Sequence, residues 1–227
     1  MDAELFPRGR TEVAPGAVHV PDWLPPGRQK ELLEACRDWA RPPAGLRTVR
    51  TPGGGTMTSR QVCLGLHWYP YGYASTVVDG DGAPVKPFPA WLGELGRRAA
   101  RDAYGDGDGA GTAGAPSPAY AYDIALINFY DADARMGMHR DSDERSDAPV
   151  VSLSLGDTCV FRFGNVASRG RPYTDVELRS GDLFVFGGPS RLAHHGVPRV
   201  HAGTAPPELG LTGRLNLTLR VSGLPAD

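Results

Sequence analysis

The chain has 227 residues, 41% of them hydrophobic and 22% charged, with a formal net charge of −2 at pH 7. This length fits one domain with a buried core. No run of about 18 apolar residues occurs, and the N-terminus lacks the apolar stretch of a secretory signal, so we expect a cytoplasmic protein without a membrane span. The charge does not by itself indicate a nucleic-acid binder. The scattered cysteines Cys36, Cys63 and Cys159 predict reduced core thiols, without a zinc or disulfide framework.

The N-terminal hundred residues predict amphipathic helices. In residues 27–40, apolar side chains recur at the i, i+3/i+4 spacing of a helix. Residues 87–104 predict a second helix, which Gly105 ends and whose apolar side would carry Trp91, Leu95, Ala99 and Ala103. The Gly-rich run 105–118 predicts a flexible loop.

Residues 39–78 contain no Asp, Glu or Lys, and their fixed charges are all arginines. The same stretch carries the aromatic cluster 67–73, with Trp68, Tyr71 and Tyr73. Guanidinium groups neutralise phosphates and aromatic rings stack on unpaired bases, so the segment predicts a nucleic-acid face. The alternative is ordinary core aromatics beside solvated arginines.

After Ala119 the chain consists of short β-rich runs separated by Gly, Pro and Asp. Even spacing of this kind predicts a β-sandwich, barrel or jelly roll. The predicted fold class is therefore α+β, mainly β, with the N-terminal helices packed outside the core. We expect residues 1–118 to give helical support and a recognition lid, and 119–227 the core, within one integrated domain.

The stretch His139-Arg140-Asp141 offers an imidazole and a carboxylate two residues apart. On a β-strand both side chains would leave the same face, which supplies two thirds of a 2-His-1-carboxylate facial triad. The third ligand would come from His194 or His195, and spacing alone leaves both open. Gly196 would let the backbone approach closely beside His195. The alternative is that the pair is incidental.

The run 214–220 alternates between leucines and polar residues, which places Arg214, Asn216, Thr218 and Arg220 on one face. Unpaired buried charges are costly, so two arginines on one face of a core strand suggest a bound anion. Their spacing leaves room for a small dianion gripped at each end. Asn128 and Tyr130 could add neutral hydrogen bonds. The alternative is an edge strand with solvated arginines.

Ordered motifs across roughly residues 120–222 resemble the AlkB family of Fe(II)/2-oxoglutarate-dependent nucleic-acid dealkylases. They are NFY, MHRDSDE, APVVSLSLG, FRFG, SGDLFVFGG, SRLAHHGV and RLNLTLR. The resemblance implies a double-stranded β-helix (jelly roll) that uses Fe(II), 2-oxoglutarate and O2. The N-terminal hundred residues resemble the family only in outline.

The resemblance also implies roles for individual residues. The implied iron ligands are His139, Asp141 and His195, because the family's second histidine directly precedes the Gly. The implied 2-oxoglutarate contacts are Asn128, Tyr130, Arg214, Asn216 and Arg220. Asp143 would help to read the damaged base, accompanied by Glu144. Trp68 and Tyr71 or Tyr73 would form a base-stacking lid.

The activity that the resemblance implies is demethylation of bases such as 1-methyladenine and 3-methylcytosine. It would be coupled to conversion of 2-oxoglutarate to succinate and CO2, and would release formaldehyde. The expected partners are alkylated single- or double-stranded DNA, with RNA as a second candidate, and the protein is expected to be a monomer. One alternative is an oxygenase of a protein side chain or small metabolite. Another is a non-enzymatic jelly-roll binding module.

Overall fold

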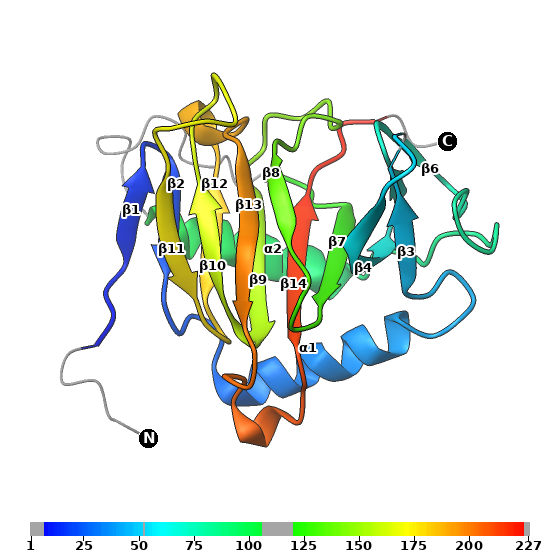
Figure 1. Ribbon diagram of the computed structural model, residues 1–227, viewed down its shortest axis with the longest axis horizontal. Coiled ribbons are helices and arrows are strands. Elements are labelled where there is room, and N and C mark those ends of the chain that lie inside the picture. Colours follow the sequence, from blue (N-terminus) through cyan, green and yellow to red (C-terminus); the bar gives the residue numbers. More distant parts are fainter. Residues whose placement is uncertain (1–6, 52, 106–119, 225–227) are drawn as a thin grey trace.

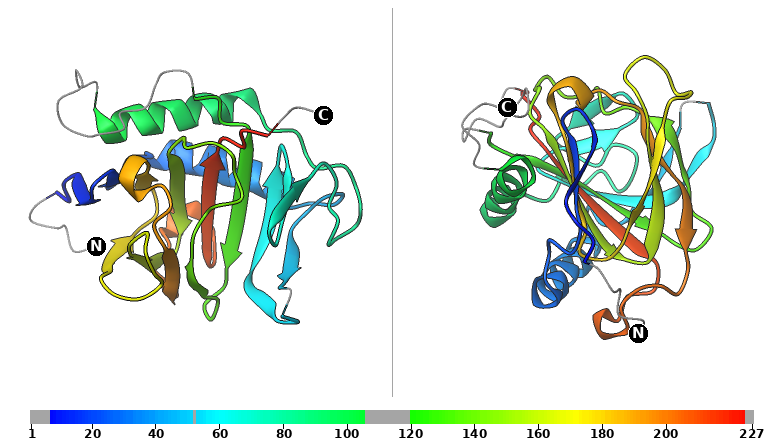
Figure 2. Two further views of the ribbon diagram at one scale, coloured as in Figure 1. Left: turned by 90° about the horizontal axis from the view of Figure 1, so that it is seen from above. Right: turned by 90° about the vertical axis from the view of Figure 1, so that its left-hand side faces the viewer.

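A computed structural model describes residues 7–51, 53–105 and 120–224, in which two antiparallel sheets face each other (Figure 1). Two helices cover the outer face of the larger sheet (Figure 2). Part of the predicted loop at 105–118 lies outside the described residues, since only Gly105 is described. The predicted mainly β jelly roll is confirmed.

The larger sheet has eight strands in the order β1-β2-β12-β9-β14-β7-β4-β3. Their bounds are Thr11–Ala14 (β1), Ala17–Val20 (β2), Leu183–Phe186 (β12), Val150–Gly156 (β9), Arg214–Arg220 (β14), Ile124–Tyr130 (β7), Thr56–Leu64 (β4) and Arg47–Arg50 (β3). The smaller sheet has the order β11-β10-β13-β8. Its bounds are Thr174–Leu178 (β11), Thr158–Phe163 (β10), His195–His201 (β13) and Met136–His139 (β8). A separate hairpin pairs β5 (His67–Tyr69) with β6 (Gly72–Ala74).

The N-terminal part contributes more to the sheet than its sequence suggested. The strands β1, β2, β3 and β4 extend the larger sheet at both of its edges, beside β12 and β7. Four strands between Thr11 and Leu64 therefore belong to the same sheet as β14.

The helices are α1 (Pro26–Trp39) and α2 (Ala90–Tyr104). Helix α1 buries Leu32, Leu33 and Cys36, as predicted. Within the described residues no helix is long and apolar enough to cross a membrane.

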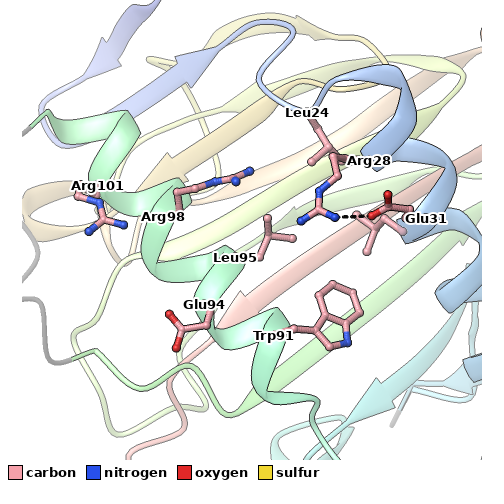
Figure 3. Close-up of a pocket in the computed structure, with 9 residues that line it drawn as sticks. Leu24, Arg28, Glu31, Trp91, Glu94, Leu95, Arg98 and Arg101 are labelled. Carbon is pink, nitrogen blue, oxygen red and sulfur yellow. Dashed lines mark hydrogen bonds and ion pairs between the residues drawn. The ribbon is translucent and has the colours of Figure 1, made fainter.

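The predicted buried face of α2 is confirmed at Ala99 and Ala103, whereas Leu95 is only partly buried and Trp91 is exposed. A Cβ on Gly96 would lie 2.7 Å from Tyr122 Cδ2, so a small residue is needed where α2 approaches the sheet. The helix is turned so that Gly96, Ala99 and Ala103 are buried, and Trp91 is left 48% exposed against Trp39. Figure 3 shows Trp91 and Leu95 lining a groove of about 560 Å³.

Two apolar clusters lie on opposite faces of the larger sheet. One packs between this sheet and the helices and contains Leu215, Leu217 and Leu219 of β14. The other packs between the two sheets and is rich in phenylalanine, including Phe161 and Phe184. The polar side chains of β14 share this second space, so they enter the interior of the sandwich.

Asp182, directly before β12, anchors the N-terminal segment. Its fully enclosed carboxylate accepts hydrogen bonds from Arg8 Nη1 at 2.7 Å and from the backbone N–H groups of Asp22 and Arg179 at 3.0 Å each. It also contacts His19 Nε2 at 2.9 Å. Burial alone would raise the pKa of Asp182, but these partners lower it to about 2.

We predict that Asp182 makes stability depend on acidity. Its folded-state pKa lies below the unfolded value, so its contribution is present above about pH 4 and disappears as pH falls through 2. The expected loss is about 2 kcal/mol, measured as the free energy of unfolding in urea. Asp182→Asn should be less stable at pH 7 and depend less on acidity, and an unchanged acid dependence would contradict this.

Candidate metal centre

Three potential ligands converge between the two sheets. His139 and His195 are register partners on the adjacent strands β8 and β13. One ligand atom from each of these residues and from Asp141 lies within 4.8 Å of the others. Asp141 and His195 are buried, whereas the His139 side chain is 36% exposed, so the group opens on one side.

Asp141 reaches the group differently from the sequence prediction. Strand β8 ends at His139, so Asp141 lies in the following loop and does not share a strand face with His139. Asp143 lies in the same loop. The Asp141 carboxylate is therefore positioned by contacts that its loop makes, and not by the alternation of side chains along a strand.

Gly196 permits the close approach of β13 to β8, as predicted. A Cβ at this position would lie 2.7 Å from Met136 O and 2.9 Å from Gly137 O. Any other residue would force the strands apart and separate the two imidazoles.

Backbone carbonyls fix the tautomers of the two histidines. The Nδ1–H groups of His139 and His195 donate to Gly137 O and Ala193 O, at 3.0 Å each. Each Nε2 therefore carries the lone pair, and each lies 3.7 Å from an oxygen of Asp141. His194 is bonded elsewhere, to Asn165 O at 3.0 Å, which resolves the choice between His194 and His195.

The protonation states suit metal binding. Burial, followed by the nearby His139, lowers the pKa of His195 to about 4. Burial alone would raise the pKa of Asp141, but Arg220 and then the histidines lower it to about 2. At neutral pH the site offers a neutral imidazole and a carboxylate, the forms that ligate metals.

One carboxylate oxygen of this site accepts no hydrogen bond from the described residues. Asp141 Oδ2 is buried and lies 2.7 Å from Arg220 Nη2, yet no described group donates to it with hydrogen-bond geometry. Two imidazoles and one carboxylate on an open-sided site are the donor set of non-haem Fe(II) oxygenases. The residues therefore fit a divalent iron.

Arg214 forms a second polar centre in the same pocket. It is 1% exposed, its Nη2–H donates to Ser154 Oγ at 2.9 Å, and its Nε–H lacks an acceptor. No carboxylate of the described residues forms an ion pair with it. A buried guanidinium without a counter-charge is costly, so the site fits an anionic ligand.

The neighbouring predicted contacts also line the pocket. Tyr130 is the register partner of Arg214, and burial raises the pKa of its hydroxyl, which stays protonated as a donor. Asn128 accepts from Gln61 Nε2 at 3.1 Å. Asn216 donates to Ser152 Oγ at 2.7 Å, so much of its hydrogen bonding is already within the protein.

Arg220 differs from the expected second end of a two-arginine clamp. Its guanidinium pairs with Asp141 at 2.7 Å and with Glu144 at 2.8 Å. Arg220 lies in the pocket beside the ligands, but its charge is matched by protein carboxylates. Of these two arginines, Arg214 is the one whose positive charge a bound anion would balance.

The predicted substrate residues fall into separate groups. Trp68, on the β5-β6 hairpin, donates from Nε1 to Asp143 Oδ2 at 2.7 Å, which brings an aromatic ring and an acid together. Tyr71, at the hairpin turn, is 82% exposed. The hydroxyl of Tyr73 donates to Glu144.

Glu144 does not sit as the sequence predicted. Its carboxylate is 0% exposed and is paired with Arg191 and Arg220. A group enclosed in this way is not presented to a base, so pairing Glu144 with Asp143 as a substrate contact is corrected. The three hydrogen bonds that the carboxylate accepts, from Arg191, Arg220 and Tyr73, could not be seen in sequence spacing.

A comparison of sequences identifies the superfamily of this site. The profile of the 2OG-Fe(II) oxygenase superfamily matches residues 16–220. The chain is 35% identical over 181 residues to the alpha-ketoglutarate-dependent dioxygenase AlkB of Escherichia coli (strain K12), covering 78% of this chain and 77% of that protein. The chain belongs to the AlkB family.

Other members of the AlkB family match over more of the chain. The "DNA N(6)-methyladenine demethylase ALKBH1D" of Arabidopsis thaliana is 33% identical over 221 residues, which is 92% of this chain and 50% of that protein. The chain thus spans about half the length of the curated Arabidopsis relatives that it matches. The solved structure of OsALKBH1 superposes with a TM-score of 0.81 at 32% identity, covering 93% of this chain and 99% of that one.

Membership of this family implies Fe(II), 2-oxoglutarate and O2. The donor set of His139, Asp141 and His195 fits Fe(II), and the guanidinium of Arg214, unpaired with any carboxylate of the described residues, fits an anion such as 2-oxoglutarate.

The sequence did not single out Arg191, which donates to Asp141 O, Gln61, which donates to Asn128, or Ser154, which accepts from Arg214. Arg191 and Ser154 lie within the quoted motifs, but their partners are distant in sequence and residue spacing does not reveal them.

We predict that His139→Ala weakens Fe(II) binding at least about 100-fold, because one of three ligands is lost. Binding is measured by anaerobic titration of Fe(II), with Mn(II) as a redox-stable substitute. His194→Ala is the matched control, since that ring is bonded to a backbone carbonyl away from the site. Equal loss in both variants would contradict the assignment of His195.

We predict that Arg214→Ala raises the apparent KM for 2-oxoglutarate about 10- to 100-fold, the value of one charge-assisted contact. Iron affinity should change little, because Arg214 has no contact with a ligand. Arg199→Ala, at an exposed position of β13, is the control. An unchanged KM would show that the anion site lies elsewhere.

Proposed function

We propose that this chain catalyses oxidative dealkylation of N-alkylated bases in DNA, with RNA as a second substrate, using Fe(II), 2-oxoglutarate and O2. The observation that carries the proposal is the contact between Trp68 and Asp143, an acid two residues after the candidate ligand Asp141. One aromatic ring and one carboxylate held together in this way suit a flat, cationic base.

The bound cofactors would supply oxidation of the alkyl carbon, with succinate, CO2 and formaldehyde as products. The protein residues bind and orient the reactants. Arg214 would hold the far carboxylate of 2-oxoglutarate, with the protonated hydroxyl of Tyr130 as a nearby donor. The carboxylate of Asp141 and the imidazoles of His139 and His195 would hold the iron.

The proposed substrate contacts are based on the charge of the damaged base. Bases such as 1-methyladenine and 3-methylcytosine are cationic and pair poorly, which lowers the cost of flipping them out. Asp143 would retain the cation, and Trp68 would stack on it. The arginines of the acid-free segment, including the exposed Arg50 and Arg60, would neutralise phosphates as a monomer engages the strand.

The named activities of the relatives support this proposal. The Arabidopsis relative is called a DNA N(6)-methyladenine demethylase, and a mouse relative is called a nucleic acid dioxygenase. N6-methyladenine therefore joins the cationic lesions as a candidate, although an uncharged base gains less from Asp143.

The test is formaldehyde release from oligonucleotides that carry 1-methyladenine, 3-methylcytosine or N6-methyladenine. Single- and double-stranded DNA and RNA are compared, with and without 2-oxoglutarate. We expect release only with 2-oxoglutarate and only from methylated strands. Turnover of 2-oxoglutarate that is stimulated by none of these oligonucleotides would reject the proposal and favour a protein or small-molecule substrate.

We predict that Trp68→Ala weakens binding of a methylated oligonucleotide about 5- to 100-fold, the value of one stacked base. Decarboxylation of 2-oxoglutarate without substrate should be preserved. Tyr71→Ala is the comparison, since the exposed Tyr71 ring has no contact with Asp143. A larger loss in Tyr71→Ala than in Trp68→Ala would transfer the stacking role to Tyr71.

A further inference from the structure

Arg191 is a buried arginine that belongs to none of the predicted ligand sets. It is 6% exposed and follows the short 3-10 helix η1 (Gly188–Ser190), four residues before His195. A buried guanidinium with no catalytic assignment needs an account, because burial of its charge is costly.

Its three donor groups all reach the loop after β8. Nη1–H donates to Asp141 O at 2.8 Å, Nε–H donates to Ala148 O at 2.9 Å, and Nη2 pairs with Glu144 Oε2 at 3.0 Å. One side chain thus spans the loop from the metal ligand to the start of β9. It joins the segment that carries His195 to the segment that carries Asp141.

The contacts continue through Glu144 to the side chain of the ligand. The second oxygen of Glu144 accepts from Arg220 Nη1 at 2.8 Å and from the hydroxyl of Tyr73. Arg220 Nη2 lies 2.7 Å from Asp141 Oδ2. Asp141 is therefore held at its carbonyl by Arg191 and at its carboxylate by Arg220, and Glu144 connects the two arginines.

This ring of two arginines and two carboxylates replaces what a strand would provide. The described loop 140–149 has no strand or helix, so backbone pairing does not fix Asp141. Loss of Arg191 would leave Glu144 and Asp141 to share Arg220, and the ligand carboxylate would lose part of its support. Groups behind a metal ligand orient it, and their loss usually weakens metal binding 10- to 100-fold.

We propose that Arg191 and Glu144 are positioning residues that hold Asp141 in place for the metal, and that Glu144 links the lid residue Tyr73 to the same ring. The inference rests on the metal site of the proposed function. It assigns Glu144 to metal-site geometry and removes it from base recognition.

The test is titration of Mn(II) into the full chain without substrate, followed by isothermal calorimetry and by the electron paramagnetic resonance of free Mn(II). We expect Arg191→Met and Glu144→Gln to bind Mn(II) about 10- to 100-fold more weakly. Arg191→Lys, which keeps the charge but loses the forked donors, should be intermediate. Arg162→Met breaks the partly exposed Arg162–Asp175 pair between β10 and β11, which contacts neither Asp141 nor Glu144, and should bind Mn(II) as the wild type does.

Unfolding of the metal-free variants in urea separates positioning from stability. A role confined to folding would lower the free energy of unfolding and leave the Mn(II) affinity of the folded variants unchanged. Gln is nearly isosteric with Glu, so Glu144→Gln still tests the inference if Arg191→Met does not fold. The double variant should bind about as weakly as the weaker single variant, because both residues act through one ring.

Two outcomes would overturn the inference. One is a folded Arg191 or Glu144 variant whose Mn(II) affinity stays within about twofold of the wild type. The other is Glu144→Gln with normal Mn(II) affinity and a raised KM for methylated oligonucleotide, which would restore a substrate contact. Failure of the wild type to bind Mn(II) would instead reject the metal site and the proposed function.

Discussion

The approach of β13 to β8 at Gly196 sets the distance between the two imidazoles, and the site depends on it. A side chain there would collide with two carbonyl oxygens of β8. Because His139 and His195 are register partners, their separation is a property of the sheet. Asp141 has no such constraint, and the structure surrounds it with charged groups. The centre thus combines ligands fixed by backbone pairing with one fixed by side chains.

The two buried arginines of β14 in the interior of the sandwich have different partners. Arg220 is neutralised by Asp141 and Glu144, so its cost of burial is offset within the protein. Arg214 has only neutral described partners, of which Ser154 is the nearest. A binding site for a dicarboxylate needs such an imbalance, because a fully paired guanidinium would gain little from the ligand.

Two of the periodic sequence patterns were reliable. The alternation in 214–220 and the apolar spacing in 27–40 predicted the faces of β14 and α1, since burial alone dictates both. The sequence pattern predicts a strand at Asp141 because residue spacing does not show that β8 stops pairing with β13 at His139. The family resemblance paired Glu144 with Asp143, and the partners that enclose Glu144, Arg191 and Arg220, could not be seen because they are 47 and 76 residues away in sequence. Such contacts arise only after the sheets have packed.

The place of β14 in the sheet also has a consequence for biogenesis. It is the last of the described strands in sequence, yet it lies in the middle of the larger sheet, between β9 and β7. Until it is inserted, β7 and β9 each expose an unpaired edge, which is a template for association with other chains. Pairing of distant segments is slow. The larger sheet is therefore completed only when β14 has paired with both β7 and β9.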